Sequence, residues 1–179
     1  MRRFRESHVA LALALATLAL IGCGKATPPE PPLTRAELKS ADLQTDYVSG
    51  GVIRLTGGEY REPAAPGSAA ETVITLTQHV AYAPLVTGQS AAAAIVETQT
   101  GGSGTYVDLV VIARQNGHPT QLAAAHLGDR VKVKSIAFDK GIVTLTMLVH
   151  GPDDPLCCPT LEVTRRYERR LDSLVQLPT

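Results

Sequence analysis

Aromatic residues are scarce in this 179-residue sequence, which contains no tryptophan, five tyrosines and two phenylalanines. Phe138 is the only phenylalanine beyond the N-terminal leader. We therefore do not expect a platform of stacked rings of the kind that holds single-stranded nucleic acid or sugars. A packed core must be built from Val, Leu, Ile and Ala, and a hydrophobic content of 44% is sufficient for one.

An excess of positive charge is also lacking. Seventeen Lys and Arg residues balance 17 Asp and Glu residues, so the formal net charge is zero. The first 22 residues hold three Arg and one Glu, which leaves 14 basic and 16 acidic residues, a net charge near −2, in the rest of the chain. This balance excludes the electrostatic attraction on which nucleic-acid binding depends, and no nucleic-acid partner is expected.

The third absence is a hydrophobic run long enough to span a membrane. Residues 9–21 form a 13-residue apolar run, whereas a transmembrane helix needs roughly 20 such residues. The run follows a basic segment that contains Arg2, Arg3 and Arg5. This combination is typical of the leader of an exported protein, and the incomplete twin-arginine motif favours the general secretory route.

The leader ends in Leu20-Ile21-Gly22-Cys23, which resembles the lipobox of bacterial lipoproteins. A small residue at Gly22 gives a peptidase access to the bond, and the Cys23 thiol is the nucleophile that accepts a diacylglyceryl group. The resemblance implies cleavage before Cys23 and acylation with fatty acids such as palmitate. Gly24, where an Asp would indicate retention in the inner membrane, favours the outer membrane, facing the periplasm. The alternative is an ordinary leader that happens to end near a cysteine.

The sequence divides into three parts. Residues 1–22 are the predicted leader, residues 23–33 the lipidated cysteine and a proline-rich tether, and residues 34–179 a single β-rich domain. Four prolines in residues 24–33 favour an extended spacer. The domain is predicted to begin with a short helix at residues 35–41, because Thr34 and Glu37 have the spacing of a capping box.

After this helix, alternating and β-branched segments predict eight to ten short strands. The fold class is therefore mainly β: an antiparallel, curled sheet, barrel-like or sandwich-like, with one short N-terminal helix. Residues 106–114 have the continuous apolar character of a central strand. The other predicted strands are residues 52–56 and 59–61 as a hairpin, 72–79, 91–98, 120–126, 131–138, 142–150 and 161–169.

Residues 127–135 (LGDRVKVKS) and 151–167 (GPDDPLCCPTLEVTRRY) resemble motifs shared by small exported bacterial lipoproteins of uncharacterised function. The resemblance implies location and architecture but no chemistry. Such proteins often carry an Asp-rich, calcium-loop-like segment before the strand that matches residues 94–97. Residues 85–94 here contain no acidic ligand, so no Ca²⁺ site is expected.

Cys157 and Cys158 are the only free thiols if Cys23 is acylated, and the predicted compartment is oxidising. Three interpretations remain open. The pair forms a strained disulfide between neighbours, stays reduced as small buried hydrophobes, or has a redox or soft-metal function with help from His150, Asp153 or Asp154. Zinc sites usually need a second ligand pair, so no metal site is predicted.

Lys132, Lys134, Arg165 and Arg166 are candidates for a basic face that contacts anionic components of the envelope. The alternative is a solvated strand face balanced by Glu162, Glu168 and Asp172, which also protects a sheet edge.

No catalytic residue is predicted. The histidines beyond the leader, His79, His118, His126 and His150, lack a neighbouring nucleophile motif. Asp108, inside an apolar strand, requires a partner, for which an arginine is the candidate, and the alternative is a structural pair or a solvent-facing position. We therefore expect no enzyme and no cofactor. The sequence predicts a non-catalytic binding or accessory module, with the membrane and another envelope component as partners, and a thiol redox or soft-metal protein as the alternative.

Overall fold

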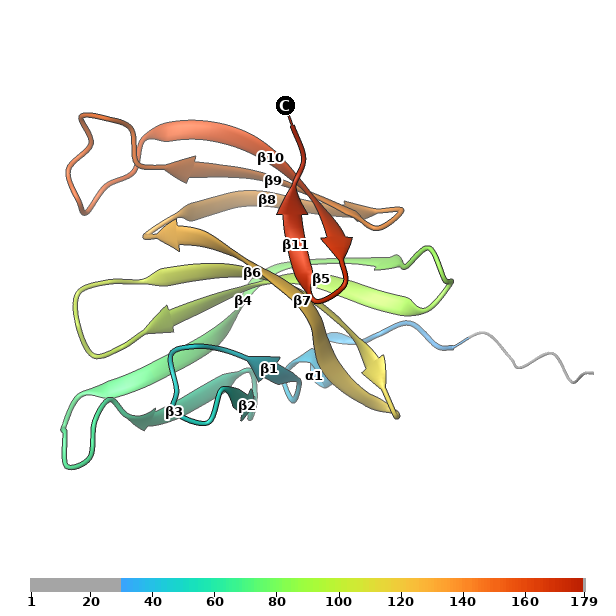
Figure 1. The fold of residues 1–179 in the computed structure, drawn as a ribbon, viewed down its shortest axis with the longest axis horizontal. Coiled ribbons are helices and arrows are strands. Elements are labelled where there is room, and N and C mark those ends of the chain that lie inside the picture. The colour runs from blue at the N-terminus through green and yellow to red at the C-terminus, as the bar shows by residue number, and fades with distance from the viewer. Residues whose placement is uncertain (1–29, 179) are drawn as a thin grey trace, which may run out of the picture.

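The computed structural model describes residues 30–178, which form one helix and eleven strands (Figure 1). The predicted leader, Cys23 and most of the predicted tether lie outside the described residues. The helix is α1 (Arg35–Leu38), one turn closed by the predicted capping box between Thr34 and Glu37. The strands are β1 (Asp42–Gln44), β2 (Val52–Arg54), β3 (Glu59–Pro63), β4 (Glu71–Pro84), β5 (Ser90–Gln99), β6 (Tyr106–Gln115), β7 (His118–Asp129), β8 (Lys132–Asp139), β9 (Ile142–Val149), β10 (Leu161–Arg170) and β11 (Ser173–Gln176).

The strands belong to one sheet with the order β3-β4-β5-β6-β7-β11-β10-β9-β8, and β1 and β2 branch from β7. Neighbours pair antiparallel except at two short parallel contacts, where Ser173 of β11 and Asp42 of β1 each meet β7. The predicted mainly β fold with a short N-terminal helix is confirmed. The sheet curls so that β8 lies near β4, but it is not closed into a barrel.

The β4–β7 part of the sheet is covered on both faces. One hydrophobic core fills the space between β4–β7 and β8–β10, and a second lies between the opposite face and α1, β1 and β2 (Figure 1). The alanine run of β5 shows why: Ala91 and Ala93 face the first core and Ala92 and Ala94 the second, all fully buried. Small side chains let layers pack closely on both faces of a central strand. This packing outweighs the preference of alanine for helices.

Two hairpins, β6–β7 and β8–β9, close through two-residue turns. Asn116 and Gly117 adopt φ of 51° and 81°, and Lys140 and Gly141 adopt 48° and 80°, the left-handed conformations that such turns require. The predicted hairpin of residues 52–61 is wrong. β2 pairs with β1 and β3 with β4, and only an isolated bridge between Thr56 and Glu59 joins the two segments.

Candidate functional site

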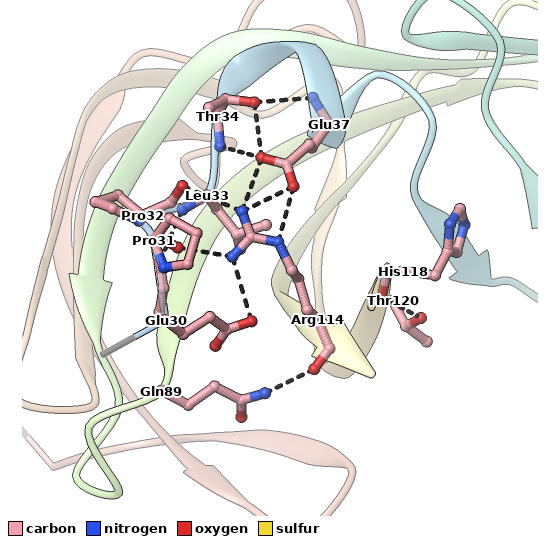
Figure 2. A network of polar contacts seen from close by, with 11 residues as sticks. Glu30, Pro31, Pro32, Leu33, Thr34, Glu37, Gln89, Arg114, His118 and Thr120 are labelled. Carbon is pink, nitrogen blue, oxygen red and sulfur yellow. Dashed lines mark hydrogen bonds and ion pairs between the residues drawn. The ribbon is translucent and has the colours of Figure 1, made fainter. Parts of the chain in front are cut away.

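Arg114, at the end of β6, holds residues 30–32, which belong to the predicted tether (Figure 2). Its side chain is only 12% exposed. Nη1 donates to the carbonyl oxygen of Pro31 at 2.7 Å and Nη2 to that of Pro32 at 3.1 Å. Nη1 also pairs with Glu30 at 3.2 Å. One guanidinium therefore fixes three consecutive residues of the entering chain.

Glu37 connects this clamp to the cap of α1. Its carboxylate accepts from Arg114 Nε at 2.8 Å and from the backbone nitrogen and the hydroxyl of Thr34 at 2.9 and 2.8 Å. The hydrogen bond from Thr34 and the charge of Arg114 lower the pKa of Glu37 below its ordinary value of 4.5, although desolvation acts in the opposite direction. A lowered folded-state pKa means that this contribution to stability is present above pH 4.5 and is lost as the pH falls through the folded-state pKa.

Arg114→Ala is expected to release residues 30–33 from the domain while the sheet stays folded. The measurement is hydrogen–deuterium exchange at the Leu33 amide, which donates to Ser90 Oγ at 2.8 Å. We expect exchange to accelerate by roughly tenfold or more, because local opening no longer breaks charge-assisted bonds. Arg54→Ala is the matched control, since Arg54 forms an exposed ion pair with Asp42. Unchanged exchange at Leu33 in Arg114→Ala would contradict the clamp.

A cavity of about 290 Å³ opens between β1 and the face of β5–β7. Its apolar lining belongs to the second core, and its polar lining comes from four separate segments of the chain. The apolar residues are Leu43, Ile53, Ile74, Val96, Val110 and Ala124, and the polar residues are Gln44, Thr45, Asp46, Tyr47, Thr98, Asp108, Gln121 and His126. An apolar pocket with a few convergent polar groups is the usual form of a small-molecule site.

Asp108 and His126 form a hydrogen-bonded pair at this cavity. They are directly opposed on β6 and β7, and Asp108 Oδ1 lies 2.8 Å from His126 Nδ1. A β-bulge at Leu127 produces this register, because Val107 pairs with Gly128 while Asp108 pairs with His126. Burial raises the pKa of Asp108, and the bond to His126 opposes this shift. The predicted arginine partner of Asp108 is therefore wrong, because no arginine reaches this face of β6 among the described contacts.

Tyr47 lies at the cavity with its ring stacked on Tyr106, at a centroid distance of 5.1 Å. Burial, together with the negative charge of Asp108, raises the pKa of Tyr47 to about 12, so its hydroxyl stays protonated. Thr98 and Gln121, 1% and 8% exposed, also face the cavity. Gln121 Oε1 accepts a hydrogen bond from the backbone nitrogen of Gln44 at 3.3 Å.

Cys157 and Cys158 lie in the loop between β9 and β10, where they are exposed and joined by a disulfide. The structure therefore favours the linked pair over buried free thiols. Asp154 holds the loop, because its carboxylate accepts from the backbone nitrogens of Gly151 and Thr160 at 2.8 and 2.6 Å. Across residues 30–178, no three His, Cys, Asp or Glu side chains come together as metal ligands.

The four basic candidates do not share one face. Successive residues of β10 point to opposite sides of the sheet, and Arg165 pairs with the buried Leu145 whereas Arg166 pairs with Thr144. Arg166 is thus on the outer face with Lys132 and Lys134, while Arg165 is on the inner side. Lys134 is neutralised by an ion pair with Glu162. This arrangement resembles the balanced, solvated face that was the alternative.

Comparison of the chain with protein-family models, with curated proteins and with solved structures finds no match. In the part of the chain that the structure describes, no helix is long and apolar enough to cross a membrane. The cavity is therefore interpreted from its own geometry. Sequence reasoning singled out Asp108 and His126 separately, and only their direct opposition across β6 and β7 identifies them as a pair.

Proposed function

We propose that this protein is a bacterial lipoprotein, anchored through acylated Cys23 in the outer membrane and facing the periplasm, whose β domain is a non-catalytic binding module. The observation that carries the binding role is the cavity beneath β1, where the side chains of Thr98, Asp108 and Gln121 converge on an aliphatic lining. A concave, mostly apolar site with a few convergent polar groups is the usual form of a small-molecule pocket.

The lining of the cavity supports the binding role, because most of its surface is aliphatic and its polar side chains converge from separate strands. The leader and the lipobox support the anchoring, and the Arg114 clamp would give the anchored domain a fixed point of attachment. The partner is then another component of the envelope, presented to the domain at the membrane surface.

The binding role is tested by thermal unfolding in the presence of a low-molecular-weight extract of the bacterial envelope. A ligand that binds only the folded state raises the melting temperature by mass action. We expect the extract to raise the melting temperature of residues 23–179 by roughly several degrees. Ala124→Leu, which fills the cavity, should remove this effect without unfolding the domain.

Ala137→Leu is the matched control, because Ala137 is exposed on β8 and is not part of the cavity lining. This variant should respond to the extract as the unaltered chain does. A response that is absent from the unaltered chain, or equally large in Ala124→Leu, would contradict a ligand site in this cavity.

A thiol redox or soft-metal function for Cys157 and Cys158 is the second candidate. The exposed disulfide favours it, because a reductant can reach both sulfur atoms. If the Cys157–Cys158 disulfide is reduced and re-formed in the bacterial envelope, this function is favoured. If the disulfide stays oxidised, the pair only stabilises the structure of the loop.

A further inference from the structure

We propose that the cavity beneath β1 binds a small ligand with an apolar body and a protonated amine. This inference rests on the proposed binding function and names the chemical class of the ligand. It follows from the sign of the charge around the cavity, the buried polar groups that face it, and its size.

Every fully charged side chain that lines the cavity is acidic. Asp46 and Asp108 contribute carboxylates, and His126 is tied to Asp108. An adjoining hollow of about 420 Å³ shares Asp46 and Gln121 with the cavity and adds a third carboxylate, Asp172. No lysine or arginine lines either space among the described residues. An approach lined by charge of one sign concentrates ligands of the opposite sign.

The buried polar groups suit an ammonium ion. The Thr98 hydroxyl oxygen and the Asp108 carboxylate are acceptors at the cavity, and a primary ammonium group has three N–H donors to satisfy. The Tyr47 ring adds an aromatic surface that attracts cations. Together these groups offer a cation both hydrogen bonds and a charge partner away from bulk water.

The same environment opposes an anionic ligand. Desolvation already raises the pKa of Asp108, and nearby negative charge contributes to the raised pKa of Tyr47. A ligand carboxylate or phosphate would add charge of the same sign to this desolvated space and find no arginine or lysine to pair with.

The volume limits the apolar body of the ligand. A space of about 290 Å³ corresponds to the volume of roughly ten water molecules, at the small end of ligand pockets. Leu43, Ile74 and Val110 line it with aliphatic surface. A single saturated ring or a short branched chain with one amine therefore fits the cavity, whereas a long acyl chain does not.

Three probes that share a cyclohexyl body test the inference: cyclohexylmethylamine, cyclohexylmethanol and cyclohexanecarboxylate. They are titrated by calorimetry at pH 7 and low salt into residues 23–179 carrying Cys23→Ser, which needs no detergent. We expect the amine to bind at least roughly tenfold more tightly than the alcohol, because it gains a charge interaction in a partly desolvated site. The carboxylate should not bind measurably.

Asp108→Asn should lower the affinity for the amine by roughly tenfold and change the affinity for the alcohol by less than about twofold. Thr98→Val should also lower the affinity for the amine and leave the fold intact, since the side chains of threonine and valine have similar shapes. Asp153→Asn is the matched control, because Asp153 is exposed in the loop between β9 and β10 and lies outside the cavity lining.

Equal binding of amine and alcohol, preferred binding of the carboxylate, or full amine affinity in Asp108→Asn would overturn the cationic class. If these probes nevertheless bind the unaltered chain and lose their binding in Ala124→Leu, the cavity remains a ligand site and the proposed function stands. If no probe binds, this inference fails, and the envelope-extract experiment decides separately whether the proposed function fails with it.

Discussion

Leu109→Ala is expected to lower the free energy of unfolding by about 3 kcal/mol, as measured by urea denaturation. Leu109 is fully buried in β6, directly between Ile95 of β5 and Ala125 of β7. Its side chain belongs to the core that joins β4–β7 to β8–β10. Removing three carbon atoms there leaves a void that a strand hydrogen-bonded on both sides cannot close.

Leu156→Ala is the control for this loss, because the same truncation is made at a residue that is 80% exposed. Its unfolding free energy should stay within about 0.5 kcal/mol of that of the unaltered chain. If Leu109→Ala were as stable as Leu156→Ala, the two halves of the sheet would not share the core described here.

Cys23→Ala is expected to abolish the incorporation of fatty acid into the protein completely. Cys23 is the thiol that terminates the lipobox-like motif, whereas Cys157 and Cys158 form a disulfide. The measurement is metabolic labelling with an alkyne-bearing palmitate, followed by detection on the purified chain. Cys157→Ser with Cys158→Ser is the control and should keep the full label.

Membrane attachment should depend on the same residue. Each buried methylene contributes about 0.8 kcal/mol, so one acyl chain gives marginal binding and several chains give effectively permanent attachment. When the leader is exchanged for one that an ordinary signal peptidase removes, the Cys23→Ala domain is expected in the soluble periplasmic fraction. Retention on membranes after a high-salt wash would show that another part of the chain binds them.

The strands that sequence reasoning located best are those with local signals. Residues 143–147 alternate between apolar residues and threonine, and Val143, Leu145 and Met147 are indeed fully buried on one face of β9. The Asn116-Gly117 turn fixes the β6–β7 hairpin for the same reason. In these segments period and turn chemistry act within a few residues, so the sequence displays them directly.

The cavity could not be found in that way, because its lining is assembled by long-range pairing. Leu43, Val96, Asp108 and Gln121 come from four strands, and β1 reaches β7 through a single parallel contact at Thr120. The bulge at Leu127 decides that His126 opposes Asp108. A shift of one residue would have pointed the histidine to the other face, and nothing local in the sequence fixes that register.

The Arg114 clamp was missed for a similar reason. Arg114 was interpreted as the end of a central strand, yet it binds Glu30, Pro31 and Pro32, more than 80 residues away. Backbone carbonyls as acceptors leave no mark in the sequence. The four candidates for a basic face are separated for a different reason. Arg165 and Arg166 are adjacent in sequence and therefore point to opposite sides of β10.

Intact-mass spectrometry of the native protein, extracted from bacterial membranes, tests the central claim most directly. We expect a chain that begins at Cys23, lacks residues 1–22 and carries the added mass of a diacylglyceryl group and an amide-linked fatty acid. An unmodified Cys23, or a mature chain that still contains residues 1–22, would contradict the account of an acyl-anchored β domain.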